Sequence, residues 1–153
     1  MSESYIAYCD GSYQPKIETG GWASIILKEG QIIKKLYYGM RNTTSNRMEL
    51  TAVIETLKFF KERVKITIYS DSQYVVNSIM EGWVKYWFDT KDYNKKNLDL
   101  WYQLLDLLEF HDVTLIWIKG HDMNVMNNYV DMLAQHAAKC LNLPEDHAKT
   151  TSF

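Results

Sequence analysis

The chain has 153 residues, of which 46% are hydrophobic, and its formal net charge at pH 7 is −2. This length can bury one good core and is too short for two ordinary domains. The small negative charge gives no overall attraction to nucleic acid, so nucleic-acid binding would depend on a local basic patch or on bound cations.

No apolar run approaches the roughly twenty residues of a membrane helix, and the first residues lack the basic and then apolar pattern of a secretory signal. We therefore expect a cytoplasmic protein that does not bind membranes. The two cysteines, Cys9 and Cys140, have no CxxC partner and no histidine at metal-ligand spacing. Their placement argues against a disulfide framework and against a zinc site.

The first forty residues alternate between apolar and polar side chains, which predicts strands over residues 5–9, 21–27 and 32–38. Turn-forming residues fill the two intervals, at 14–20 and 29–30. Links this short join neighbouring antiparallel strands. The first part of the chain is therefore predicted to form an antiparallel meander.

The rest of the chain alternates between helical and strand patterns. We expect helices over residues 46–62, 72–80, 98–109 and about 127–140, and strands over residues 65–70 and 113–118. Helix-bearing connections imply right-handed crossovers and parallel pairing, so the expected fold is an α/β mixed sheet with packed helices. Residues 1–141 form the expected single domain, and residues 142–153 a loosely held tail.

Four acidic residues are candidates for chemistry, and each also has an ordinary structural explanation. Asp10 precedes a glycine, as in a hairpin turn. Glu49 follows Asn46 by three positions, as a capping-box glutamate does. Asp71 lies between a strand and a helix, where N-caps are common, and Asp131 fits a solvated or salt-bridged helix face. No single acid is diagnostic.

The joint placement of the four acids is more informative. Asp10 is expected on a strand that pairs in parallel with the strand ending at Asp71, at the carboxyl end of the sheet where α/β sites form. Glu49 and Asp131 come from helices that flank this sheet. Converging carboxylates repel one another unless cations neutralise them, and magnesium prefers such oxygen ligands. The pattern therefore predicts a divalent-metal site.

Four motifs occur in order along the chain: Asp10-Gly11-Ser12, the run Thr43-Thr44-Ser45-Asn46-Arg47-Met48-Glu49-Leu50, the run Ser70-Asp71-Ser72-Gln73-Tyr74-Val75, and Trp117-Ile118-Lys119-Gly120-His121 followed by Asp131. Together they resemble type 1 ribonuclease H of the bacterial form, and their spacing is compatible over essentially the whole chain. The resemblance implies a ribonuclease H-like five-stranded mixed sheet of order 3-2-1-4-5, antiparallel over strands 1-2-3 and parallel over 1-4-5, with helices on both faces.

The resemblance also implies an activity, namely hydrolysis of the RNA strand of RNA/DNA hybrids with two Mg²⁺ ions, or Mn²⁺ in their place. It assigns metal coordination to Asp10, Glu49, Asp71 and Asp131, and a proton-transfer or product-release role to His121. A histidine suits that role because imidazole titrates near neutral pH. Taken alone, His121 would be interpreted as an exposed loop residue.

Further positions match residues that bind the hybrid in the family. Asn46 and Gln73 match positions that reach the minor groove, and Thr44 matches one that holds a DNA phosphate; Gly11, Ser12 and Ser45 complete the expected set. The chain also departs from the pattern. Ser45 and Lys16 replace asparagines, and Asn42 and Tyr86 replace the arginine and asparagine that commonly accompany the phosphate-binding threonine.

The segment of residues 83–96 mixes aromatic and basic side chains, as nucleic-acid backbones favour. The family has a longer basic protrusion here, and the expected contacts are Trp83, Trp87, Lys95 and Lys96. Equally, both tryptophans could belong partly to the core while the lysines solubilise a loop.

Two alternatives compete with an autonomous ribonuclease H. One is a DNA nuclease of the resolvase or transposase type on the same fold, against which Gln73, the His121 loop and the complete acid set argue. The other is a non-catalytic hybrid-binding module, which would lack one or more of the acids. Nothing in the sequence requires a dimer, so a monomer is expected.

Overall fold

The computed structural model describes residues 4–82, 86, 96–120, 124–140 and 143–146. Its helices and strands follow in the order β1 (Ser4–Gln14), β2 (Thr19–Lys28), β3 (Gln31–Arg41), α1 (Ser45–Lys58), β4 (Lys65–Ser70), α2 (Gln73–Met80), α4 (Leu98–Phe110), β5 (Asp112–Trp117) and α5 (Val125–Ala138). The strands form one sheet of order β3-β2-β1-β4-β5. β1 pairs antiparallel with β2 and parallel with β4, as expected.

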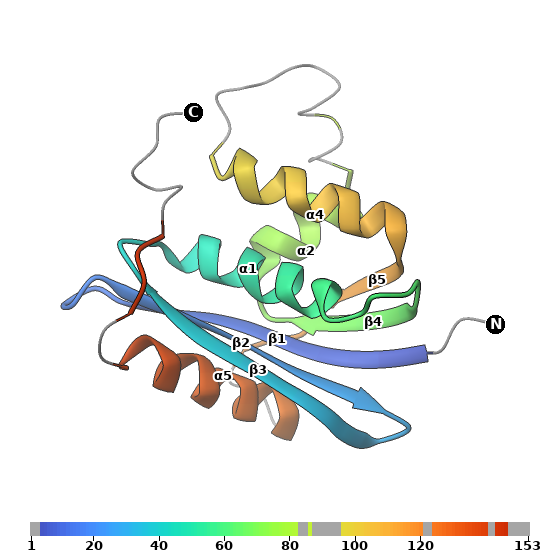
Figure 1. Ribbon diagram of the computed structural model, residues 1–153, viewed down its shortest axis with the longest axis horizontal. Coiled ribbons are helices and arrows are strands. Elements are labelled where there is room, and N and C mark those ends of the chain that lie inside the picture. The colour runs from blue at the N-terminus through green and yellow to red at the C-terminus, as the bar shows by residue number, and fades with distance from the viewer. Residues whose placement is uncertain (1–3, 83–85, 87–95, 121–123, 141–142, 147–153) are drawn as a thin grey trace.

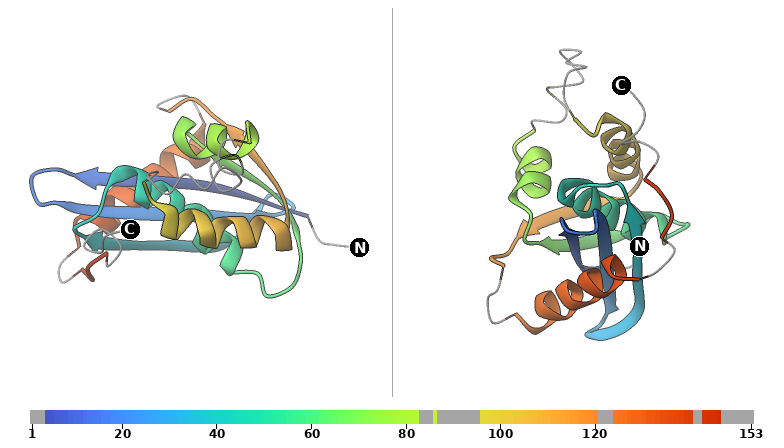
Figure 2. Two further views of the ribbon diagram at one scale, coloured as in Figure 1. Left: turned by 90° about the horizontal axis from the view of Figure 1, so that it is seen from above. Right: turned by 90° about the vertical axis from the view of Figure 1, so that its left-hand side faces the viewer.

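The helices cover the sheet from two sides. α1, α2 and α4 lie on one face and α5 lies on the other (Figures 1 and 2). Strand residues alternate between the faces, so Ala7 and Cys9 of β1 join the larger core beneath α1. Ala23 and Ile25 of β2 form a smaller core with α5. The expected three-layer arrangement is confirmed.

β1 continues four residues beyond Asp10, so the hairpin-turn explanation of Asp10-Gly11 is wrong. Asp10 pairs with Ala23 of β2, and the chain reverses only between Gln14 and Thr19. Gly11 serves close packing instead, because a Cβ there would lie 2.5 Å from the backbone nitrogen of Glu49. The missing side chain lets α1 approach β1, and this approach positions Glu49 beside Asp10.

α1 begins one residue earlier than predicted and ends at Lys58 rather than at residue 62. Thr44 is its N-cap, and the Thr44 hydroxyl accepts a hydrogen bond from the Arg47 backbone nitrogen at 3.2 Å. Glu49 therefore lies in the second helical turn and not at the capping-box position. Helix capping therefore does not explain why a glutamate is buried at position 49.

The C-terminal helix also ends earlier than predicted, at Ala138, and the chain then returns to the start of α1. The Pro144 carbonyl accepts a hydrogen bond from the Arg41 nitrogen at 2.7 Å, and Asp146 is 7% exposed. The expectation of a loosely held tail is thus wrong for residues 143–146, because these residues bind the loop before α1. No helix among the described residues is long and apolar enough to cross a membrane.

Candidate active site

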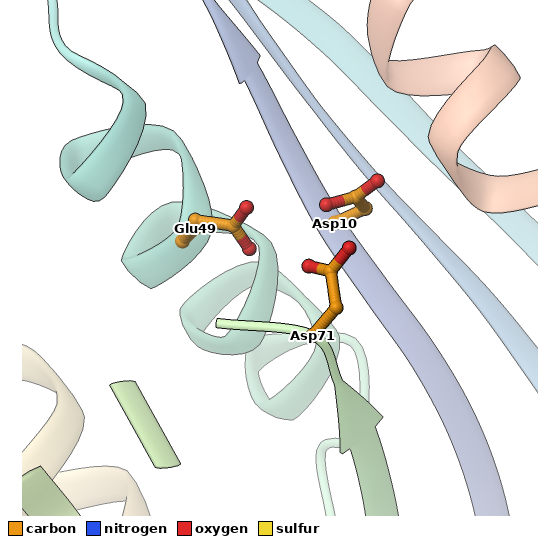
Figure 3. Close-up of side chains that lie close together, drawn as sticks. All are labelled: Asp10, Glu49 and Asp71. Carbon is orange, nitrogen blue, oxygen red and sulfur yellow. The ribbon is translucent and has the colours of Figure 1, made fainter. Parts of the chain in front are cut away.

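Three carboxylates converge where the carboxyl end of β4 lies beside the middle of β1. Asp10 comes from β1, Glu49 from α1, and Asp71 directly follows β4; their carboxylates point toward one another (Figure 3). One carboxylate oxygen of each residue lies within 4.8 Å of the others. The parallel register, which pairs Cys9 with Ser70, places Asp10 and Asp71 at matching positions.

Asp131 approaches the same point from the opposite face of the sheet. It lies on α5, is half-buried, and accepts a hydrogen bond from Gln135 Nε2 at 3.0 Å. The Asp131 side chain is one of the causes that raise the pKa of Asp10, after burial and the charges of Glu49 and Asp71. The structure therefore brings Asp131 beside Asp10, although it lies outside the tight group of three.

The acid cluster is electrostatically unfavourable by itself. Burial is the main cause that raises the pKa of both Asp10 and Glu49, and the charge of nearby Asp71 raises both further. Asp10 Oδ2 and Glu49 Oε2 are buried without a hydrogen-bond partner among the described residues. Buried polar atoms are rarely left without partners. Two such oxygens facing a third carboxylate are what a divalent cation binds.

Asp71 does not cap the following helix, contrary to its ordinary structural explanation. Ser72 is the N-cap of α2, and its hydroxyl accepts a hydrogen bond from the Val75 nitrogen at 3.2 Å. The loop after β5 instead packs on Asp71. Trp117 Nε1 donates to the Asp71 carbonyl at 3.1 Å, and a Cβ on Gly120 would lie 3.0 Å from Asp71 Oδ2.

Trp117 was not singled out from the sequence, although it begins one of the four motifs. Its indole links β5 to the backbone of Asp71, so it helps to hold this acid in place.

Arg47 was also not identified from the sequence as a residue that shapes the site. It lies in the motif that contains Glu49, but its partners, Asp99 and Asp146, are far away in the sequence.

The structure describes seven of the predicted hybrid-binding residues, several of which are near the acids in the sequence. Asn46 precedes Glu49 by one helical turn and is exposed, and Gln73 is exposed at the start of α2. Thr44 is half-buried as the N-cap of α1, next to exposed Ser45, while Gly11 and Ser12 are half-buried on β1. Lys96 is exposed just before α4. Trp83, Trp87, Lys95 and His121 lie outside the described residues.

Comparisons with known proteins agree with this architecture. The family model for RNase H matches residues 2–139. Ribonuclease H of Desulforamulus reducens is 44% identical over 144 residues, which cover 91% of this chain and 90% of that protein. Ribonuclease H of Caldicellulosiruptor saccharolyticus is 41% identical over 140 residues, which cover 88% and 95%.

Solved structures show the same fold. A type 1 RNase H with the type 2 active-site motif superimposes with a TM-score of 0.80 at 27% identity, over 90% of this chain and 73% of that one. The protease-reverse transcriptase of prototype foamy virus gives a TM-score of 0.79 at 24% identity, over 90% of this chain and 21% of that one, which is a likeness of fold. From its motifs, its topology and these relatives, the chain belongs to the ribonuclease H family.

Proposed function

We propose that the protein is an endonuclease that hydrolyses the RNA strand of RNA/DNA hybrids at the acid cluster. Family and fold both support this activity. The observation that carries the catalytic part is the pair of buried, unpartnered oxygens, Asp10 Oδ2 and Glu49 Oε2, beside Asp71. A stable fold retains such a cluster only when something else compensates for it.

The proposed compensation is divalent metal, with Asp10, Glu49, Asp71 and Asp131 as ligands. Their all-oxygen donor set fits two Mg²⁺ ions, with Mn²⁺ as the alternative. Bound there, divalent ions supply a lowered pKa for the attacking water and stabilisation of the departing 3′ oxygen. The expected products carry 5′-phosphate and 3′-hydroxyl ends, and no side chain becomes covalently attached to the substrate.

The protein's own residues have distinct proposed tasks. Asp10 and Glu49 are buried and rigidly placed by β1 and α1, so they define where the scissile phosphate is held. Asp131 comes from α5 and is half-buried, so it completes the set from the other face of the sheet. His121 is proposed to transfer a proton or to assist product release.

The hybrid is proposed to lie across the acids between two groups of contacts. Thr44, Ser45, Asn46 and Gln73 form one group with Gly11 and Ser12, and the aromatic and basic segment with Trp83, Trp87, Lys95 and Lys96 forms the other. We further propose that residues 1–141 act as a single catalytic domain, and that the protein works as a monomer in the cytoplasm.

One assay tests this proposal. Labelled RNA/DNA hybrid, double-stranded RNA, single-stranded RNA and double-stranded DNA are incubated with the protein, in magnesium or in chelator. Only the hybrid should be cut, only on its RNA strand and only in magnesium. Equal cutting of all substrates, or cutting in chelator, would contradict the proposal. Undiminished activity of an Asp71→Asn variant would contradict the assignment of the site.

A further inference from the structure

A second cluster of buried charges lies on α1, two residues before Glu49. The side chain of Arg47 is 5% exposed and binds two aspartates at once. Its Nε and Nη2 donate to Asp146 at 2.7 and 3.0 Å. Its Nη1 and Nη2 donate to Asp99 at 3.0 and 2.8 Å. Both pairings have the planar bidentate form that fixes the position of an arginine.

Asp146 holds the loop before α1 at several points. Besides binding Arg47, its carboxylate accepts a hydrogen bond from Thr43 Oγ1 at 2.8 Å, and its backbone nitrogen donates to the Arg41 carbonyl at 3.0 Å. These contacts lie on both sides of Thr44. The residues proposed to touch the hybrid, Thr44 to Asn46, are therefore enclosed between positions that Asp146 binds.

The same arginine also fixes the start of α4. Arg47 Nη1 donates to Asn97 Oδ1 at 3.3 Å, and Asn97 is the N-cap of α4 with a left-handed backbone, φ 65°. Asn97 directly follows the aromatic and basic segment that ends at Lys96. One guanidinium thus connects the ends of both proposed groups of hybrid contacts.

Stability alone does not account for this arrangement. Buried ion pairs cost desolvation energy, and replacing a complete buried cluster by apolar residues is often neutral or stabilising. What a bidentate arginine does supply is a fixed distance and angle between the elements that it joins. A nucleic-acid duplex is a rigid ligand, so two protein contacts must be spaced correctly to bind it together.

We propose that Asp146, acting through Arg47, is a positioning residue for hybrid binding, so that the segment after α5 sets the spacing of the substrate contacts. This inference rests on the proposed function. It assigns a role in recognition to residues 143–146. Loss of the Asp146 carboxylate should weaken hybrid binding while leaving the acid cluster, and hence the chemical step, intact.

The test compares Asp146→Asn with Asp146→Glu in the full chain. For Asp146→Asn, we expect KM for the hybrid to rise about fivefold or more, with kcat within about twofold of wild type. Asp146→Glu keeps the charge and should recover most of the affinity. Thr43→Val removes a single hydrogen bond to Asp146 and should raise KM less. If Asp146→Asn does not fold, KM of Thr43→Val still tests the inference.

A matched control separates positioning from general stability. His111 is bound to the opposite end of α1 through Leu57, so His111→Phe should lower Tm without changing KM. Unchanged KM in both Asp146→Asn and Thr43→Val would overturn the inference. So would an equal rise in KM for His111→Phe at the same loss of Tm.

Hybrid binding can also be measured without cleavage, by fluorescence anisotropy in an Asp71→Asn background. There the additional Asp146→Asn change should weaken binding by the same factor as it raises KM. Absence of cleavage by the wild type would defeat the proposed function. Equal binding with and without Asp146→Asn would defeat only the positioning role.

Discussion

Two clusters of acidic side chains meet α1 two residues apart, at Arg47 and at Glu49, and they differ in one respect. The carboxylates around Arg47 are paired with a cation supplied by the chain. The carboxylates around Glu49 repel one another, and two of their oxygens have no partner among the described residues. The first cluster is neutralised by a side chain of the protein itself. The second cluster has no such cation among the described residues, and carboxyl groups with strongly shifted pKa values mark candidate functional sites.

The largest expected effect comes from Asp10→Asn. We expect activity on the hybrid to fall about 1,000-fold or more, because a ligand for the metal is lost. In chelator, the same change should raise the free energy of unfolding by about 1 kcal/mol, since it removes a buried acid whose ionisation is opposed by burial and by Glu49. Single-turnover cleavage and urea unfolding measure the two effects. A variant that lost stability as well as activity would contradict the contrast between the clusters.

Arg47→Ala should have the opposite effect on stability. It leaves Asp99 and Asp146 without their cation, and removing one member of a buried ion pair typically costs about 3–5 kcal/mol. Lys58→Ala serves as the control, because the exposed pair of Lys58 and Glu55, at 3.6 Å, should contribute under about 0.5 kcal/mol. Urea unfolding of both variants tests the difference. Similar small losses in both would show that the Arg47 cluster is not stabilising.

Asp131→Asn should have an intermediate effect. Asp131 is half-buried and lies outside the group of three acids, so its loss should lower activity by about 10- to 100-fold, less than the loss of Asp10. Its effect on the free energy of unfolding should stay within about 0.5 kcal/mol. Cleavage rates of the two variants, measured side by side, test the ranking. Equal loss of activity in Asp10→Asn and Asp131→Asn would show that the burial of an acid does not determine its importance for cleavage.

The smallest expected effect concerns His111, a buried titratable group whose hydrogen bonds are satisfied. Its Nδ1 accepts from the Val64 nitrogen at 3.2 Å, and its Nε2 lies 3.0 Å from the Leu57 carbonyl. The imidazole is therefore neutral, with Nε2 as the donor. Burial, aided by the charge of Arg63, lowers its pKa from the ordinary value of 6.5.

This lowered pKa has a defined consequence for stability. The unfolded chain binds the His111 proton more readily than the folded chain, so the contribution is complete above the ordinary pKa and is lost as the pH falls below it. Between pH 7 and 5, the free energy of unfolding should fall more for wild type than for His111→Phe. Urea unfolding at each pH measures this. Parallel curves for the two proteins would contradict the assignment of a neutral imidazole.

The sequence predicted those parts of the fold that depend on local pattern. β4 has the bounds that the sequence predicted, and the antiparallel and parallel pairings follow from short and helix-bearing links, whereas the strand order was implied by the family resemblance. The end of β1 was not predictable, because Asp10-Gly11 has the composition of a turn and only pairing with β2 keeps it extended. The start of α1 was misjudged by one residue, since both Thr44 and Asn46 are suitable caps.

The residues of the candidate site likewise fall into those that the sequence predicted and those that it did not. The four acids were found because their order and spacing match family motifs, and the topology brings them together. The roles of Arg47 and Asp146 were not predictable, because the two residues are 99 positions apart and neither has a local signal. Only the folded chain shows that residues 143–146 return to the loop before α1.

The central claim is that the cluster of Asp10, Glu49, Asp71 and Asp131 is a site for divalent metal. Thermal unfolding of wild type and Asp10→Asn over a range of magnesium concentrations tests it most directly, because a cation that binds only the folded state stabilises it, by about 1.4 kcal/mol at ten times the dissociation constant. Tm of wild type should rise with magnesium, while Tm of Asp10→Asn should hardly change. Equal shifts for both proteins, or none for wild type, would contradict it.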